Sequence, residues 1–248
     1  MNDLEGKNIL ITGASSGIGR EVAIQCSKMG ANIILIGRNI EKLYEVIKLL
    51  TLGDHLPLKY DLLDLDNIKK GIIDKFKGKI ISGFVHCAGI EKTVPVHLIK
   101  PQIYNEIFNI NVFAGFELAK FLQKKGIYNE NGTSFIFISS VRAFKGCKAH
   151  LVYSSSKGAI ISAVKSLALE LANKKIRVNC ISPGIVLTDM VEKNFSIISN
   201  ESVNNIIKQY PLGVGNSQDI ANLILFLLSD ISRWITGSNI IIDGGYSA

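Results

Sequence analysis

The sequence predicts an α/β protein of one domain, in which a doubly wound parallel β-sheet carries helices on both faces. Short apolar runs rich in β-branched residues alternate with longer segments whose apolar residues recur at helical spacing. The short runs have the composition of strands buried on both faces, as parallel strands are. No linker rich in Pro, Gly or Ser, no low-complexity tract and no repeat beyond this alternation interrupts the 248 residues, so we treat residues 1–248 as one domain.

The expected elements follow one another along the whole chain. Apolar β-branched runs predict strands at 8–12, 32–36, 56–60, 83–87, 134–139, 177–182 and 239–243. Apolar residues at helical spacing predict helices at 17–29, 40–50, 66–76, 102–125, 152–173 and 218–228. The stretch 186–215 breaks the alternation, because it is polar and contains Pro211, Gly213 and Gly215. We expect it to form a substrate-binding lid.

Composition excludes several classes of protein. A hydrophobic content of 47% is enough for a sizeable core, so a disordered or fibrous chain is not expected. No apolar run approaches the roughly 18 residues that span a bilayer, and the first residues lack the basic-then-apolar pattern of a signal peptide. We therefore expect no membrane association and a cytoplasmic location.

Charge and cysteine content point away from nucleic acid and metal. The net charge of +7 comes mainly from separated lysine pairs, such as Lys124 with Lys125 and Lys174 with Lys175. Dispersed charge is typical of a solvated surface, although it can attract an anionic cofactor or an acidic carrier. The four cysteines stand singly without C-x-x-C spacing, which predicts neither disulfides nor a metal site.

A glycine-rich turn follows the first expected strand. Gly13, Gly17 and Gly19 stand in G-x-x-x-G-x-G spacing between that strand and the first helix. Because glycine has no Cβ, such a turn can bring backbone N–H groups and a helix N-terminus against a pyrophosphate. An ordinary tight turn is the alternative for the glycines alone, and their place between strand and helix favours a dinucleotide site.

The end of the second expected strand bears on the choice of dinucleotide. Folds that bind NAD place an acid there for the ribose 2′-hydroxyl, and this chain has Arg38 just beyond the strand instead. A guanidinium can pair with a 2′-phosphate, so we expect NADP(H) to be preferred, with NAD(H) possible. The alternative is a solvated Arg38 beside a helix cap at Asn39. Asp61 can accept a hydrogen bond from the adenine amino group or serve only as a turn residue.

Tyr153 and Lys157 are candidates for proton transfer. Four residues apart in an expected helix, they project from the same face. Reduction of a carbonyl needs a proton at its oxygen, and a nearby lysine cation is expected to lower the pKa of the tyrosine toward the working range. A surface packing pair is the ordinary meaning of this spacing when it stands alone.

The order of motifs along the chain resembles the short-chain dehydrogenase/reductase family. The motifs are T-G-A-S-S-G-I-G at 12–19, H-C-A-G at 86–89, Asn111, Ser140, Tyr153, Lys157 and the pair Pro183 and Gly184, and the resemblance runs essentially from Leu4 to Gly245. It implies a Rossmann fold and an NADP-dependent oxidoreductase acting on CH–OH groups or the corresponding carbonyls.

The resemblance implies a role for each matching residue. Tyr153 matches the general acid/base, Lys157 the residue that also binds the nicotinamide ribose, Ser140 the hydroxyl that polarises the carbonyl, and Asn111 the residue that holds a proton-relay water. The expected cofactor contacts are Gly13, Ser15, Ser16, Gly17, Ile18, Gly19, Arg38, Asp61, Leu62, Cys87, Ala88, Gly89, Asn111, Tyr153, Lys157, Pro183, Gly184, Ile185 and Thr188. Of these, Ser15 and Arg38 match positions that meet the adenosine phosphate.

Two departures from the family pattern bear on rigidity and on substrate. Cys87 stands where the family has the asparagine of N-A-G, so some rigidity of the sheet is in doubt. The segment 91–96 does not match the T-R-D-x-L pattern usual in 3-oxoacyl carrier-protein reductases, the type that the chain otherwise resembles. A sugar, a steroid or a small secondary alcohol is the alternative substrate. A dinucleotide-binding regulator without activity is the alternative of another class.

The resemblance also implies a homotetramer or dimer. Its subunits would bury the long helices at 102–125 and 152–173 between them. The expected substrate is a small or carrier-bound carbonyl compound.

Overall fold

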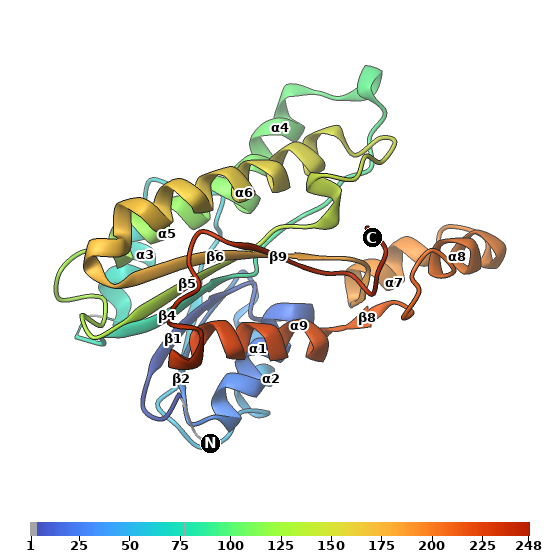
Figure 1. Ribbon diagram of the computed structural model, residues 1–248. Helices are drawn as coiled ribbons and strands as arrows, with labels where there is room; N and C mark the ends of the chain where they lie inside the picture. Colours follow the sequence, from blue (N-terminus) through green and yellow to red (C-terminus); the bar gives the residue numbers. More distant parts are fainter. Residues whose placement is uncertain (1–3, 77) are drawn as a thin grey trace.

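Seven parallel strands form the central sheet in the computed structural model, which describes residues 4–76 and 78–248 (Figure 1). The strands are β1 (Asn8–Thr12), β2 (Asn32–Gly37), β3 (Leu56–Lys59), β4 (Ile81–His86), β5 (Thr133–Ile138), β6 (Ile176–Pro183) and β9 (Asn239–Ile242). Their spatial order is β3-β2-β1-β4-β5-β6-β9, so the order reverses between β1 and β4. The predicted strands and the doubly wound Rossmann-type sheet are confirmed.

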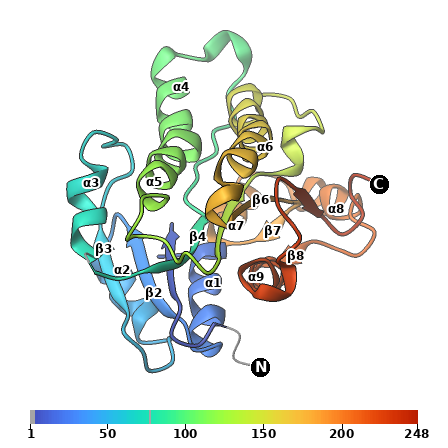
Figure 2. The same ribbon diagram turned by 60° about the vertical axis from the view of Figure 1, so that its left-hand side comes forward.

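Helices cover both faces of this sheet. One face carries α3 (Ile68–Gly71), α4 (Pro101–Phe108), α5 (Ala114–Leu122) and α6 (Leu151–Leu171), and the other carries α1 (Gly17–Lys28), α2 (Ile40–Ile47) and α9 (Ser217–Leu228) (Figures 1 and 2). Alternate residues of each strand therefore enter two separate cores. In β1, Leu10 packs under α5 and α6, whereas Ile9 and Ile11 pack against α1 and α9.

Two predicted helices are interrupted in the structure. The helix expected at 66–76 is a single turn, α3, followed by a 3₁₀ turn (Ile73–Phe76). The break comes at Gly71, where the chain passes so close to the Tyr60 ring that a Cβ would overlap it. Ile68, Ile72 and Phe76 are nevertheless buried, which accounts for the helical spacing in the sequence.

The helix expected at 102–125 is divided by a π turn at Asn109–Phe113, between α4 and α5. Within it the Ala114 N–H donates to the Asn109 carbonyl, five residues back, so the segment holds one residue more than an α-helix would. The turn contains Asn111. Apolar periodicity could not reveal the insertion, because Ile107 before the π turn and Ile110 and Val112 within it are all buried.

The stretch expected to be a lid forms a small subdomain at the carboxyl ends of the strands. It consists of β7 (Val186–Leu187), α7 (Asp189–Phe195), α8 (Asn200–Ile207) and β8 (Gly215–Asn216), and β7 pairs with β8. A capping box joins Asn216 and Asp219, which fixes the start of α9 directly after this excursion.

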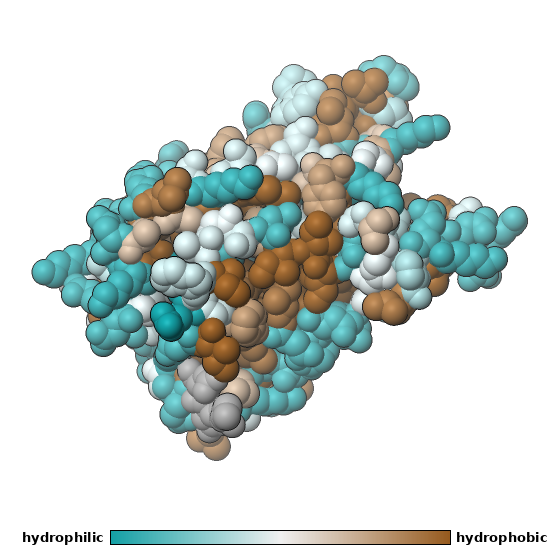
Figure 3. Space-filling view, in the orientation of Figure 1, coloured by the Kyte–Doolittle hydropathy of each residue, from teal (hydrophilic) through white to brown (hydrophobic). Residues whose placement is uncertain are grey.

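Strand β9 lies at one edge of the sheet and borders an apolar surface. Figure 3 shows hydrophobic residues gathered over β9, between α6 and α9. Ile241 and Phe226 are exposed there, by 47% and 38% of their surface. None of the helices in the described part of the chain is both long and apolar enough to cross a membrane.

Candidate active site

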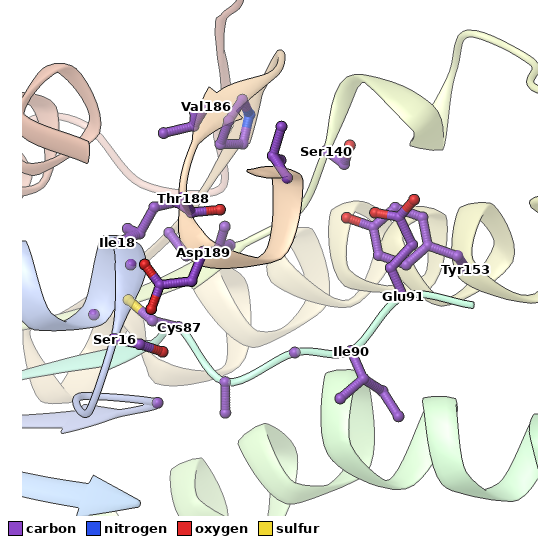
Figure 4. Close-up of a pocket in the computed structure, with 18 of the residues that line it drawn as sticks. Ser16, Ile18, Cys87, Ile90, Glu91, Ser140, Tyr153, Val186, Thr188 and Asp189 are labelled. Carbon is purple, nitrogen blue, oxygen red and sulfur yellow. The ribbon is translucent and has the colours of Figure 1, made fainter. Parts of the chain in front are cut away.

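A pocket of about 590 Å³ runs along the carboxyl ends of β1, β2, β4, β5 and β6. Open α/β sheets bind ligands at this edge, near the point where the strand order reverses. All the residues expected at the site except Asn111 line this pocket. Figure 4 shows Ser16, Ile18 and Cys87 toward one end and Ser140, Glu91 and Tyr153 toward the other.

The glycine-rich turn brings β1 into close contact with the loop after β4. Gly13 has φ +65°, and a Cβ there would lie 2.9 Å from the backbone nitrogen of Ala88. The turn leads into α1, whose N-cap residue Ser16 makes no side-chain capping bond, and whose first turn has no acidic residue. The first N–H groups of α1 therefore face the pocket without a side-chain acceptor, as an anion site requires.

Arg38 and Asp61 lie where the adenosine end of a dinucleotide is expected. Arg38 follows β2, is exposed, and forms no ion pair with any residue of the described segments. The side chain of Asn39 caps α2 by accepting from the Lys42 N–H at 2.8 Å, as the alternative interpretation expects, and Arg38 lines the pocket. Asp61 accepts from the Leu63 N–H at 3.1 Å, which is a turn contact, and it also lines the pocket.

The H-C-A-G motif contains a buried hydrogen-bond chain. The Ala88 N–H donates to the Thr12 hydroxyl oxygen at 3.1 Å, and that hydroxyl lies 2.9 Å from Nδ1 of His86. Nε2 of His86 lies 3.0 Å from the carbonyl of Ile110 in the π turn. Because a carbonyl only accepts, Nε2 carries the proton and the Thr12 hydroxyl donates to Nδ1. Burial lowers the pKa of His86 to about 4, which keeps the ring neutral.

The hydrogen-bond chain through His86 bears on the rigidity of the sheet, which was in doubt because Cys87 replaces the family's asparagine. His86, next to it, ties β1, β4 and the π turn together. Cys87 itself lines the pocket, and burial raises the pKa of its thiol to about 12. A thiol held in its neutral form is a poor nucleophile and metal ligand. No group of three or more His, Cys, Asp or Glu side chains able to hold a metal occurs within residues 4–76 and 78–248.

Asn111 lies behind the pocket wall and positions the loop that follows β4. Its Oδ1 accepts from the Ile90 N–H at 2.8 Å, while its Nδ2 donates to the Ile90 carbonyl and to the Ser156 hydroxyl, both at 3.0 Å. The side chain is fully buried. Asn111 is therefore not among the residues that line the pocket, because its amide is occupied by the Ile90 backbone and by Ser156. Its expected contacts with a proton-relay water and with the cofactor stay predictions.

Ser140, Tyr153 and Lys157 meet at the end of the pocket away from Arg38. Ser140 follows β5, and Tyr153 and Lys157 lie in the first two turns of α6. The Lys157 ammonium donates to the Ile138 carbonyl at 2.8 Å and lies 5.6 Å from the centre of the Tyr153 ring. A hydrogen bond joins Ser140 to Tyr153.

The protonation of this group differs from the sequence expectation. Burial first, and then the negative charge of Glu91, raise the pKa of Tyr153 above its ordinary value, and the Ser140 hydrogen bond offsets this only in part. The expected effect of Lys157 is not found: it is not among the groups that lower the pKa of Tyr153, and burial lowers its own pKa to about 8, so it is still mainly cationic at neutral pH. Tyr153 therefore holds its proton at neutral pH.

The segment after β6 closes the pocket from the lid side. Pro183 ends the strand, and Gly184, Ile185 and Thr188 line the pocket beside it. The Ile185 N–H donates to the Tyr210 hydroxyl at 3.2 Å, which ties this segment to the loop after α8. Val191, Phe195, Ile197, Ile198 and Ile206 add an apolar wall from the lid.

Four acidic or basic pocket residues were not assigned from the sequence. They are Glu91 in the loop after β4, Arg142 after β5, His150 just before α6, and Asp189 at the start of α7. Glu91 stands in the segment 91–96 that departs from the 3-oxoacyl reductase pattern, and His150 is three residues before Tyr153. The departure of the segment 91–96 from the 3-oxoacyl reductase pattern was the signal in the sequence that this side of the pocket differs from that of those reductases.

Comparison with known proteins agrees with this geometry. Residues 13–247 match the family model described as enoyl-(acyl carrier protein) reductase. The 3-oxoacyl-(acyl-carrier-protein) reductase of Rickettsia felis is 34% identical, covering 99% of this chain and 98% of its own length. L-xylulose reductase of Caenorhabditis elegans is 31% identical, with 99% of this chain and 97% of its own covered.

Two solved structures are similar over nearly the whole chain. One, from Agrobacterium tumefaciens, is assigned as a 2-deoxy-d-gluconate 3-dehydrogenase with bound NADP; it has a TM-score of 0.86 and 28% identity, with 99% of this chain and 98% of the other covered. The other is 4-hydroxyisoleucine dehydrogenase complexed with NADH, with a TM-score of 0.88, 29% identity, and 98% of this chain and 99% of the other covered.

The fold, the pocket and these relatives define an oxidoreductase that uses a nicotinamide dinucleotide and interconverts carbonyl compounds and alcohols. The chain belongs to the short-chain dehydrogenase/reductase family, and the resemblance found in the sequence is confirmed.

Proposed function

We propose that the protein reduces a ketone to a secondary alcohol with NADPH, with Tyr153 as the proton donor. The observation that carries this proposal is the pocket itself, which joins the open N-terminus of α1 to Ser140, Tyr153 and Lys157. The cofactor, when bound, supplies the hydride. Tyr153 supplies the proton, which its raised pKa keeps on the phenol at neutral pH.

The residues present fit a dinucleotide. The first turn of α1 offers N–H groups to a pyrophosphate and has no acidic residue of its own, and the pocket extends from there to Arg38 on one side and Tyr153 on the other. We assign Gly13, Gly17 and Gly19 to the pyrophosphate and Lys157 to the nicotinamide ribose. Gly184 and Thr188 are assigned to the carboxamide.

We propose that NADP(H) is preferred over NAD(H). Arg38 is exposed at the end of β2 without an ion-pair partner in the described segments, and an acid that would repel a 2′-phosphate is absent from that strand end. A guanidinium can hold a 2′-phosphate with two parallel hydrogen bonds. The bound NADP of the Agrobacterium relative supports this preference, and the NADH of the other relative shows that the fold accepts either.

The carbonyl would be oriented by Ser140 and protonated by Tyr153, which share a hydrogen bond at the substrate end of the pocket. Asn111 acts as a positioning residue, since it fixes Ile90 and Ser156 around this end. The segment 186–215 would cover the substrate as a lid. We also propose a homo-oligomer, because β9 is an open sheet edge beside the exposed apolar residues Ile241 and Phe226.

Oxidation of NADPH with a panel of small ketones and acetoacetyl thioesters tests the proposed activity. We expect turnover by the wild type, and a loss of roughly a hundredfold or more in Tyr153→Phe with nearly unchanged cofactor affinity. Phenylalanine keeps the ring that packs in the site and removes only the proton donor. Cofactor binding without turnover of any ketone would contradict the proposal and favour a regulator that kept only the fold.

A further inference from the structure

The substrate end of the pocket has a charged wall that the proton-transfer groups do not explain. Nε2 of His150 lies 2.7 Å from Oε1 of Glu91, and both residues line the pocket. Figure 4 shows the Glu91 side chain beside Tyr153. The rings of His150 and Tyr153 are edge to face, with centroids 6.3 Å apart. The side chains of His150 and Glu91 are only 12% and 23% exposed, so this pair is held in the wall and is not a mobile surface contact.

The contacts of His150 define the charge of the pair. Its Nδ1 lies 2.9 Å from the Lys148 carbonyl, and its Nε2 faces the Glu91 carboxylate. Both partners only accept, so both ring nitrogens carry a proton and the pair is an imidazolium with a carboxylate. The hydrogen bond to Glu91 raises the pKa of His150, which agrees with this assignment.

Glu91 does not assist proton transfer by Tyr153. Its negative charge raises the pKa of that tyrosine and so opposes formation of tyrosinate. Glu91 is therefore available to contact the substrate. It has room to do so, because a carboxylate can accept about four hydrogen bonds and His150 supplies one at Oε1.

We propose that the Glu91–His150 pair selects ketones that carry a hydroxyl group on the carbon next to the carbonyl, with Glu91 accepting the hydrogen bond of that hydroxyl. This inference rests on the proposed function and names the substrate class of the same site. A ketone without the hydroxyl would displace water from the carboxylate and leave it without that donor, which is unfavourable in a half-buried site. Apolar lid residues such as Phe195 and Ile198 would contact the carbon skeleton.

The specificity depends on whether the substrate offers a hydroxyl donor to the Glu91 carboxylate. Loss of a hydrogen bond to a buried charged group lowers affinity for the transition state by roughly tenfold to a hundredfold. A 3-oxoacyl thioester has only a methylene group at the carbon next to its keto group and gives Glu91 no hydroxyl donor. The charged wall therefore favours a hydroxyketone over the carrier-bound alternative.

The test compares 3-hydroxy-2-butanone with 2-butanone, which differ only in that hydroxyl. With NADPH, we expect the wild type to show a kcat/KM ratio that favours the hydroxyketone, and Glu91→Leu to lower this ratio roughly tenfold or more. Dividing the variant ratio by the wild-type ratio removes the difference in intrinsic reactivity of the two ketones. Glu91→Gln, which keeps the shape and a carbonyl acceptor, should give an intermediate ratio.

Lys92→Ala is the matched control. Lys92 follows Glu91 directly, but it pairs with Glu106 and does not line the pocket. The ratio of kcat/KM for 3-hydroxy-2-butanone to kcat/KM for 2-butanone should be the same in Lys92→Ala as in the wild type. Retained NADPH binding and far-ultraviolet circular dichroism establish that each Glu91 variant is folded.

Two outcomes would overturn the inference while leaving the proposed function intact: equal ratios in the wild type and both Glu91 variants, or a higher kcat/KM for an acetoacetyl thioester than for the hydroxyketone. Failure of the wild type to reduce any ketone would instead overturn the proposed function, and this inference with it.

Discussion

The Thr12 hydroxyl and Nδ1 of His86 lie 2.9 Å apart, between the carboxyl ends of β1 and β4. The distances fit a neutral imidazole, whose Nδ1 accepts the Thr12 proton while its Nε2 donates to the Ile110 carbonyl. Burial favours this neutral form, because it lowers the pKa of His86 to about 4, and the Thr12 oxygen also accepts from the Ala88 N–H. The dinucleotide turn, the H-C-A-G motif and the π turn thus share one titratable group.

We expect His86 to make the folded state sensitive to acid. The fold holds the pKa of His86 at about 4, whereas the unfolded chain has an ordinary value of 6.5. The unfolded chain therefore takes up the proton first as pH falls, so this contribution is complete above pH 6.5 and is lost progressively down to about pH 4. The loss should amount to about 3 kcal/mol.

Urea unfolding between pH 4 and 8 measures this effect as the difference between the wild type and His86→Asn. The variant should have a flatter dependence of the free energy of unfolding on pH in that window. His97→Asn, at an exposed position, is the control and should follow the wild type. A slope unchanged by His86→Asn would show that His86 is not the buried neutral base described above.

Arg38→Asp should reverse the coenzyme preference. Replacing a cation that faces the 2′-phosphate by an anion should weaken NADPH by roughly a hundredfold, with a far smaller effect on NADH. Isothermal titration with each coenzyme gives the two dissociation constants. Lys42→Asp makes the same change of charge in α2 outside the pocket, and should leave the preference as it is. If Arg38→Asp also leaves it unchanged, the 2′-phosphate lies elsewhere.

Gly13→Ala should destabilise the protein more than Gly126→Ala. Both glycines have positive φ, +65° and +82°, so both alanines incur the left-handed backbone cost of about 1 kcal/mol. Only at Gly13 does the added Cβ meet backbone, at 2.9 Å from Ala88, whereas nothing lies within 4 Å at Gly126. We expect a further loss of about 1–3 kcal/mol at Gly13, measured by thermal or urea unfolding. Equal losses would contradict the close contact between β1 and the H-C-A-G loop.

Asn111→Ala should lower the free energy of unfolding by about 3 kcal/mol. The change removes the partners of both the N–H and the carbonyl of Ile90, and each unsatisfied buried group costs about 1–3 kcal/mol. Urea denaturation measures the loss. Asn105→Ala, on the exposed side of α4, should stay within about 0.5 kcal/mol of the wild type. A loss no larger at Asn111 than at Asn105 would mean that its amide does not hold this loop.

Much of the fold and of the cofactor site was predictable from local sequence. Most of the seven strands are short apolar runs that contain β-branched residues, and the four consecutive buried residues Ile33–Ile36 are typical of a central parallel strand. The glycines were predictable for a related reason: at Gly13 the conformation and the contact with Ala88 both exclude a side chain, so the constraint is visible as a residue type.

The interruptions of the helices were not predictable, because they preserve the apolar pattern. Ile68, Ile72 and Phe76 are buried whether the segment is an α-helix or a series of turns. The pKa of Tyr153 was mispredicted for a different reason. Spacing along a helix fixes the distance to Lys157, but burial and the charge of Glu91 come from elements far away in the sequence.

The charged wall was also missed because its partners are distant. Glu91 and His150 are 59 residues apart, each a single polar residue in a loop, and neither belongs to a periodic pattern. Only the fold of the loop after β4, held by Asn111, brings the carboxylate to the imidazole. Residues that set substrate selection in this way need coordinates before they can be recognised.

The π turn at Asn109–Phe113 makes the geometry of the site depend on the number of residues between α4 and α5. Deleting one residue there would restore regular α-helical winding and rotate α4 by about 100° about its axis relative to α5. The Asn111 amide would turn away from Ile90. The Ile110 carbonyl, which accepts the hydrogen bond from Nε2 of His86, would turn with it. A shortened chain would thus keep Asn111 and the Ile110 carbonyl and still have neither of them in register.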